Sequence, residues 1–213
     1  IASIRTKLLL LSLALTLVPL IILAFISNRF LRTSIEIQSN ESLRVAAEQT
    51  RLSIDNFIES NIDSLEIEST LGSIRNYLAL ETNERPNSVE ESALRSTLLS
   101  LQTKEQIYQP AYAVLDLGGT VTYSTERSSI GTSEADTSYF QSVSSTGISH
   151  VSPVEFPTNS SSGFIYFISP IKSESAQIVG YLRSRYDARI LQSILDNNLG
   201  LIGNRSYPIL LDE

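Results

Sequence analysis

Residues 111–124 read AYAVLDLGGTVTYS, and this stretch decides the expected fold of the second half of the chain. β-Branched and aromatic residues occur on both sides of the Gly118-Gly119 dipeptide, as strands favour. Two adjacent glycines accept the positive backbone angles of a tight hairpin turn. The stretch therefore predicts an antiparallel hairpin made of residues 111–117 and 120–124.

The sequence after this hairpin continues the strand pattern and interrupts it once with a helix. Residues 124–137 read as a polar loop, and residues 155–162 form a second loop with Pro157 and several serines. Residues 172–177 (KSESAQ) join two apolar runs as a hairpin loop. The expected elements are a short helix at 138–146 ended by Gly147, strands at 148–154, 164–169 and 178–186, and a closing helix at 188–198.

The sequence before the hairpin is helical in character from residue 28 to about residue 80. It contains no proline, and its only glycine is Gly72. Apolar side chains recur mostly in steps of three and four, which places them on one stripe of a helix. This stripe packs on its own domain, pairs with a second subunit, or does both. Its members are Leu43, Ala47, Ile54, Phe57, Ile58, Ile62, Leu65, Leu71, Ile74 and Leu78.

A break and a second helix follow this stripe. Residues 82–88 read TNERPNS, and Pro86 disfavours a helical conformation before it. Ser88 and Glu91 then have the spacing of a capping box. We expect a helix over residues 89–107 that presents Leu94, Leu98 and Leu101 on one face and ends before Pro110. Long helices on one face of about five antiparallel strands, with a short helix inserted after the second strand, define an α+β domain.

An uncharged apolar run lies near the start of the chain. Residues 8–26 read LLLLSLALTLVPLIILAFI, and roughly nineteen helical residues at about 1.5 Å each span close to 30 Å. A cleaved signal peptide is the alternative. The run exceeds the usual signal core of about 7–15 residues, and no small-x-small cleavage site follows it. We therefore expect an uncleaved transmembrane helix with the lipid bilayer as its partner.

Charge alone does not orient this helix in the membrane. Arg5 and Lys7 precede the run, while Arg29 and Arg32 follow it, so the positive-inside rule is nearly balanced. The sequence begins at Ile1 and ends in the apolar run of residues 208–211, from which we expect a piece of a longer protein.

The composition excludes several classes of function. The 213 residues carry 23 acidic and 16 basic side chains, a formal charge of −7, which argues against a nucleic-acid partner. The absence of cysteine excludes disulfides and thiolate metal sites. His150 is the only histidine, and no nucleophile-elbow pattern accompanies it. Gly118-Gly119 is not followed by the pattern of a phosphate-binding loop. We expect no catalytic residues, no metal and no cofactor; a tethered hydrolase using His150 is the remote alternative.

The order of these segments resembles the Cache family of extracytoplasmic sensor domains. The residues that carry the resemblance are Leu115-Asp116-Leu117-Gly118-Gly119, Tyr139-Phe140, Thr146-Gly147, Ser152-Pro153-Val154, Ser169-Pro170-Ile171 and Gly180. The resemblance as a whole covers roughly residues 30–213. The resemblance implies a PAS-like sheet. It also implies the extracytoplasmic ligand-sensing region of a transmembrane receptor, with a cytoplasmic kinase, cyclase or chemoreceptor output domain beyond this chain.

The tail SYPILLDE, residues 206–213, resembles the opening strand of a second Cache module. The resemblance implies that the N-terminus lies in the cytoplasm and that the sensing module lies on the periplasmic or extracellular side. We also expect a homodimer formed through the long helix. The segments are a transmembrane helix at 1–28, a long stalk helix at 29–85, a membrane-distal PAS-like module at 86–199, and the start of a truncated membrane-proximal module at 200–213.

The family's ligand pocket lies between the sheet and the inserted helix with its flanking loops. The resemblance therefore implies that Tyr123, Tyr139 and Tyr166 line a pocket for a small molecule, unless these rings simply fill the core. Arg127, in the loop before the inserted helix, would meet a ligand carboxylate or remain a solvated loop charge. Arg183 and Arg185, with Asp187, are expected to form a surface ion pair or to meet the stalk helix.

The inserted helix departs from the amino-acid-binding members of the family. Those members carry an Arg and a Trp just before the helix tyrosine, whereas this chain has Asp136 and Ser138 before Tyr139. Glu155 is not at a convincing position for a ligand amine. The ligand class therefore stays open, and a membrane-tethered structural or adhesive domain, with its pocket packed shut by the three tyrosines, is the alternative function.

Overall fold

The computed structural model describes residues 4–104, 108, 110–157 and 162–198. The chain divides into two compact units, one made of Ile1–Gln49 with Asn198–Glu213 and the other of Thr50–Asn197. Thr50–Asn197 contains the whole sheet and the helical segments that pack on it. The expected second module at residues 200–213 lies outside the described residues.

The first helices differ in one respect from the expected continuous helix of residues 28–80. Helix α1 (Ile4–Ser69) ends before a short break, and α2 (Gly72–Ala79) begins at Gly72. At the break, the hydroxyls of Ser69 and Thr70 donate to the carbonyls of Glu66 and Ile67, a local bonding pattern that competes with helix continuation. Within the described ranges, no helix is both long enough and apolar enough to cross a membrane.

The predicted capping interaction at Ser88 is confirmed. Helix α3 (Val89–Gln102) begins where the Ser88 hydroxyl accepts from the Glu91 backbone N–H at 2.9 Å. The Glu91 carboxylate accepts from the backbone N–H of Asn87 instead of that of Ser88, so the box is displaced by one residue. Residues 105–107 of the expected helix lie outside the described residues.

Replacement of Ser88 by alanine removes this cap. We expect a loss of about 1 kcal/mol in the free energy of unfolding, because a backbone donor at the helix start loses its acceptor. Urea unfolding of the full chain measures the loss. Ser96→Ala, an exposed substitution within the same helix, is the control. Equal losses for both variants would contradict a specific capping role.

The sheet has five antiparallel strands, as predicted. Their order is β2-β1-β5-β4-β3, so the last long strand lies at the centre. The 3-10 helix η1 (Arg127–Ser129) and helix α4 (Ser138–Thr146) are inserted after β2, and Gly147 ends α4 in the left-handed conformation at φ +66°. The other elements are β1 (Ala111–Leu115), β2 (Val121–Ser124), β3 (His150–Val151), β4 (Phe164–Lys172), β5 (Ile178–Asp187) and α5 (Arg189–Asn198).

The strand expected at residues 148–154 is shorter than predicted. Only His150–Val151 pairs regularly with β4, although Glu155 forms a further isolated bridge to Phe164. Between them lies Pro153, which has no N–H to donate to the ladder. The sequence pattern therefore predicts a strand here correctly but overestimates its length, and the structure places it at the edge of the sheet.

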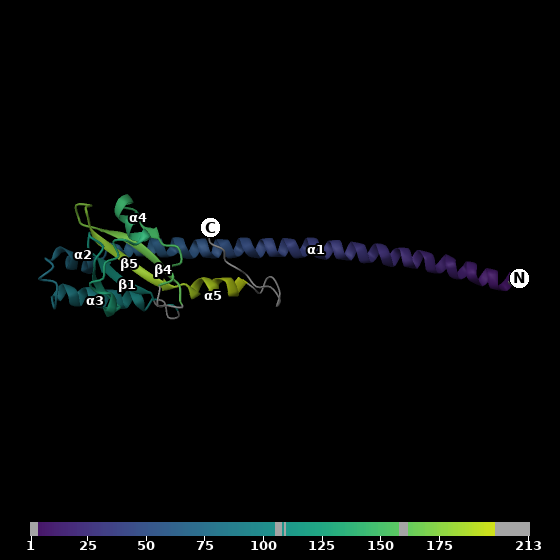
Figure 1. The fold of residues 1–213 in the computed structure, drawn as a ribbon, viewed down its shortest axis with the longest axis horizontal. Coiled ribbons are helices and arrows are strands. Elements are labelled where there is room, and N and C mark those ends of the chain that lie inside the picture. The colour runs from purple at the N-terminus through teal and green to yellow at the C-terminus, as the bar shows by residue number, and fades with distance from the viewer. Residues whose placement is uncertain (1–3, 105–107, 109, 158–161, 199–213) are drawn as a thin grey trace. The chain divides into compact units, whose positions relative to one another are not determined.

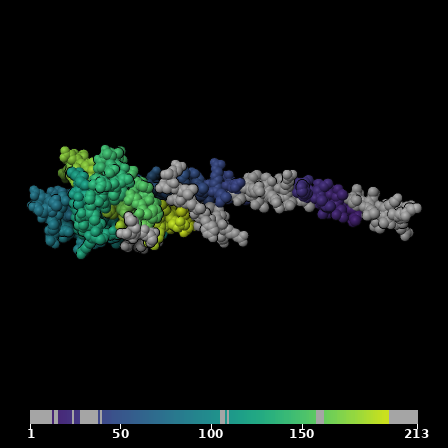
Figure 2. Space-filling view, in the orientation of Figure 1, coloured from purple at the N-terminus to yellow at the C-terminus, as the bar shows by residue number. Residues whose placement is uncertain are grey.

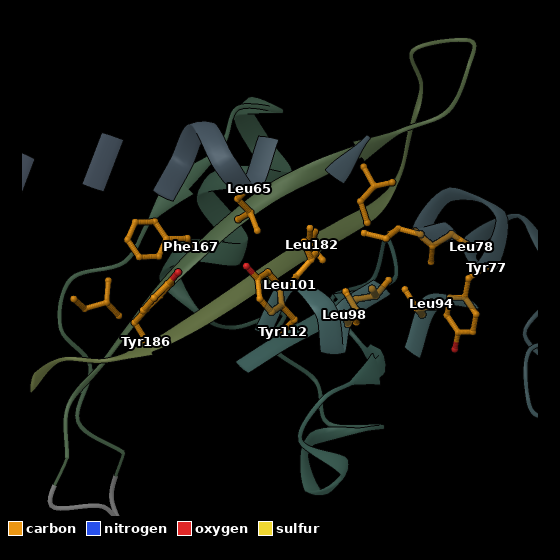
Figure 3. Packing of buried hydrophobic residues seen from close by; sticks show 14 of the residues in the cluster. Leu65, Tyr77, Leu78, Leu94, Leu98, Leu101, Tyr112, Phe167, Leu182 and Tyr186 are labelled. Carbon is orange, nitrogen blue, oxygen red and sulfur yellow. The ribbon is translucent and has the colours of Figure 1, made fainter. Parts of the chain in front are cut away.

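The two faces of the sheet carry different cores. On one face, α2, α3 and the C-terminal part of α1 pack over a cluster that includes Leu65, Leu98, Phe167 and Leu182, while α4 packs on the opposite face (Figures 1 and 3). The part of the helical stripe from Ile54 to Leu65 therefore packs on its own domain. Leu43, earlier in the stripe, is exposed.

Candidate functional site beneath helix α4

The candidate site is built around two stacked tyrosines that the sequence analysis singled out. Tyr139 lies in the first turn of α4. Tyr166 lies on the face of β4 that packs against α4. Their ring centroids are 4.9 Å apart with an interplanar angle of 12°. Thr137 caps α4 by accepting from the Phe140 N–H, which fixes where this first turn starts. The structure thus brings together two of the four predicted ligand residues.

A buried ion pair lies beside the stacked rings. The Arg183 guanidinium donates to both carboxylate oxygens of Glu134, at 2.7 and 3.3 Å. Only 3% of the Arg183 side chain and 12% of the Glu134 side chain are exposed. The Tyr139 hydroxyl donates to the same carboxylate at 3.0 Å. Glu134 is therefore the acceptor that joins the rings to the buried cation.

Backbone contacts hold Glu134 in this position. Its N–H donates to the Gly119 carbonyl at 2.8 Å, and its carbonyl accepts from the Thr137 hydroxyl at 2.7 Å. Gly119 sits in the hairpin turn with φ +81°, and a Cβ there would lie 3.0 Å from the Ala135 backbone. The hairpin turn and the cap of α4 therefore place Glu134 opposite Arg183.

Burial also determines the ionisation of the two tyrosines. Burial, together with the nearby Glu134 carboxylate, raises the pKa of Tyr139 far above its ordinary value. Burial raises the pKa of Tyr166 as well, although Arg185 and Arg183 act in the opposite direction. Both hydroxyls stay protonated at neutral pH, so they can form hydrogen bonds with a ligand. The two rings offer it apolar surface.

A second cation–carboxylate pair extends the same face. Arg185 donates to Glu126, and its guanidinium lies 4.4 Å from the centroid of the Phe164 ring. Arg183 similarly lies 5.5 Å from the Tyr166 centroid. These arginines were predicted to form a surface ion pair with Asp187 or to meet the stalk helix. That prediction is wrong for Arg183, which is buried and faces α4, and Asp187 binds Arg189 instead.

The structure does not bring Tyr123 and Arg127 into this cluster. Tyr123 is the partner of Val114 in the β1–β2 register, so it shares the helix-covered face of the sheet. Its ring packs edge-on against Tyr77 with centroids 6.1 Å apart. Arg127 lies exposed in η1. The sheet therefore separates Tyr123 from Tyr139 and Tyr166.

Sequence reasoning missed Glu134 and Arg183 as site residues. The alternation of side chains along a strand could have identified Arg183. Leu182 packs in the apolar cluster beneath α1, α2 and α3, so its neighbour Arg183 must face the other side of the sheet. Glu134 had no such signal, since it lies in an irregular loop 49 residues away from its partner.

The remaining buried polar groups are paired within the described part of the chain. Among the described residues, every buried side-chain nitrogen or oxygen has a hydrogen-bond partner. No group of three or more acidic or histidine side chains in the described part of the chain could hold a metal ion. His150 pairs with Ile168 in the β3–β4 ladder, and the backbone pairing alone accounts for its position.

Glu155 gives the cluster a pH dependence. Burial and the neighbouring Glu134 carboxylate raise the pKa of Glu155 above 4.5, so the folded chain holds this proton more tightly than the unfolded chain. That contribution to stability is lost as the pH rises through the raised value. We therefore expect Glu155→Gln to be more stable than the wild type at pH 7.

Urea unfolding of both proteins at pH 7 and pH 4 measures this difference. The advantage of Glu155→Gln should shrink at pH 4, where wild-type Glu155 is increasingly protonated. Glu84→Gln, at an exposed position outside the cluster, is the control for a general charge effect. A Glu155→Gln protein that is less stable at pH 7, or whose advantage is independent of pH, would contradict the explanation.

Solved structures of several bacterial ligand-binding and sensor domains have a similar fold. An extracellular ligand binding receptor from Desulfohalobium retbaense shares 15% identity at a TM-score of 0.55, over 73% of this chain and 27% of that one. The sensor domain of the Vibrio cholerae histidine kinase DctB shares 16% identity at a TM-score of 0.56, over 80% and 61%.

A third similar structure is the ligand-binding domain of the Pseudomonas aeruginosa PAO1 amino acid chemoreceptor PctC in complex with GABA. It shares 12% identity at a TM-score of 0.53, over 76% of this chain and 67% of that one. This chain spans less than two thirds of the first two structures. No family model and no curated protein matches it. The likeness supports the predicted α+β, PAS-like fold.

Proposed function

We propose that this chain is the extracytoplasmic ligand-sensing region of a transmembrane signal-transduction receptor. The observation that carries the proposal is the buried cluster of Glu134, Tyr139, Tyr166 and Arg183 between the sheet and α4. The fold supports it, because similar structures are sensor domains of a histidine kinase and of a chemoreceptor. The output domain, of kinase, cyclase or chemoreceptor type, would lie outside this chain.

The chemistry of the cluster favours a small molecule with a carboxylate. A buried guanidinium binds a carboxylate through two parallel hydrogen bonds, and the Tyr139 and Tyr166 rings offer apolar surface beside it. In this structure the Glu134 carboxylate accepts the hydrogen bonds that the Arg183 guanidinium could give to a ligand. A ligand carboxylate would therefore compete with Glu134 for the same donors, and binding would release the loop of residues 130–137 from the sheet.

A second candidate function has its own observation. All described buried polar side-chain atoms are already satisfied, and Tyr139 stacks directly on Tyr166. A structural or adhesive domain that binds no ligand predicts such a closed arrangement. That hypothesis also predicted Tyr123 as part of the closure, but Tyr123 packs against Tyr77 on the opposite face.

A thermal-shift screen separates the two functions. The purified full chain is heated in the presence of small acids, amines and sugars, and the melting temperature is recorded. A sensor is stabilised by about 2.7 kcal/mol at a ligand concentration of 100 times Kd, which raises the melting temperature by several degrees. Stabilisation by at least one small acid supports the sensor. No shift with any compound supports the structural domain.

Membrane attachment is a separate part of the proposal. The uncharged run of residues 8–26 supports a transmembrane helix. The resemblance to sensor domains supports an N-terminus in the cytoplasm and a module on the other side. A homodimer through the long helix is supported by the exposure of Leu43, Val45 and Leu52. Carbonate-washed membranes should retain the full-length protein. Recovery in the soluble fraction would contradict the anchor.

A further inference from the structure

A cavity lies at the end of the sheet's long strands opposite Asp187. It has a volume of about 500 Å³, within the range of small-molecule sites. Its walls come from the last turn of α1, from α2, from the residues that follow α4, and from the β4–β5 hairpin. Figure 2 shows this hairpin beside the α4 region on the surface. None of Glu134, Tyr139, Tyr166 or Arg183 lines it.

Two of the lining residues are cations whose charged ends lack a protein partner. Arg75 on α2 is half-buried, and Lys172 ends β4. Among the described residues, neither side chain takes part in an ion pair or a hydrogen bond. Five other described arginines and lysines, by contrast, have a carboxylate partner. A half-buried guanidinium without an acceptor favours an anionic ligand, which its planar fork binds with two hydrogen bonds.

The rest of the wall is rich in hydroxyl groups. Ser149 donates to the Glu66 carboxylate at 2.7 Å, and its oxygen lies 3.1 Å from that of buried Ser169. Ser69 is also buried, and Ser173 and Thr70 complete the polar lining. Hydroxyl groups donate and accept, so they pair well with hydroxyl groups of a ligand.

The charges of the wall limit the ligand's own charge. Glu66 and Glu174 face the same cavity as Arg75 and Lys172, so the four charges sum to zero. One ligand carboxylate can bind the two cations, whereas a second negative charge would meet the two glutamates. We propose that this cavity is a second ligand site, for a small hydroxylated monocarboxylate such as a hydroxy acid or a sugar acid.

Calorimetric titration of the full chain tests this site with D-gluconate, D-galacturonate and L-lactate. We expect at least one of them to bind the wild type. Arg75→Gln and Lys172→Gln should each weaken that binding by about 10- to 100-fold, the loss expected for a hydrogen bond to a charged group. Arg95→Gln, which removes the same charge from α3 outside the cavity, is the matched control and should bind like the wild type.

Two further titrations separate this site from the cluster beneath α4. D-Glucose, which lacks the carboxylate, should bind at least tenfold more weakly than D-gluconate. For an acid whose binding Arg75→Gln weakens, Glu134→Gln should leave the affinity unchanged, because Glu134 does not line this cavity. The proposal is overturned if none of the three acids binds, if Arg75→Gln binds as the wild type does, or if Glu134→Gln alters the affinity.

Discussion

Replacing Arg183 by methionine should reduce the free energy of unfolding by about 3–5 kcal/mol. Methionine fills a similar volume but leaves the Glu134 carboxylate buried without its cation, and an uncompensated buried charge costs about this much. Arg183 and Glu134 are both largely buried, at 3% and 12% exposure, so water compensates little. Urea unfolding of the full chain, followed by the near-UV circular dichroism of its tyrosines, measures the loss.

The double variant Glu134→Gln/Arg183→Met is the decisive control. Glutamine removes the stranded charge and can still accept from the Tyr139 hydroxyl, so the double variant should lose far less stability than Arg183→Met alone. A non-additive cycle of this kind reports direct coupling between the two side chains. Equal losses for the single and the double variant would show that Arg183 stabilises the fold through packing alone.

Phe167→Ala should also cost about 3–5 kcal/mol. Phe167 is fully buried on the face of the sheet covered by α1, α2 and α3, near Tyr186 of β5 (Figure 3). Its ring meets Phe57 of α1 and Tyr186 edge-on, with centroids 5.9 and 5.7 Å apart. Truncation removes the transfer free energy of the ring and leaves a cavity between the sheet and α1. Urea unfolding again gives the magnitude.

Phe156→Ala is the matched control for this substitution. Phe156 is 71% exposed, so removal of the same ring should change the free energy of unfolding by less than about 0.5 kcal/mol. A small effect of Phe167→Ala would contradict the packing of α1 against β4. A large effect of Phe156→Ala would show that this exposed ring has a partner beyond the described residues.

The fold was predictable wherever local chemistry determines it. The glycine pair at 118–119, the left-handed Gly147 and the alternation in β4 each act over a few residues, so the sequence predicts the hairpin, α4 and the central strands. The break after Ser69 was missed, because serine and threonine are compatible with a helix until their hydroxyls bond back to its carbonyls.

The candidate site was only partly predictable, because its charges pair over long distances in sequence. Tyr139 and Tyr166 were found, since both belong to regular elements. The role of Arg183 depends on Glu134, which an irregular loop supplies from 49 residues away. The prediction that Tyr123 lies beside Tyr139 and Tyr166 is wrong, because side chains alternate between the two faces of a sheet. Its pairing with Val114 places Tyr123 on the face covered by α1, α2 and α3.

The most direct test of the sensor account is the dissociation constant of a small carboxylate for the Glu134→Gln variant, compared with the wild type. The neutral amide competes less strongly for Arg183, so an acid from the thermal-shift screen whose binding is unaffected by Arg75→Gln, and which therefore binds outside the cavity lined by Arg75, should bind Glu134→Gln at least tenfold more tightly. Unchanged or weaker binding by Glu134→Gln would mean that the ligand's carboxylate does not go to Arg183, and the cluster beneath α4 would then be structural.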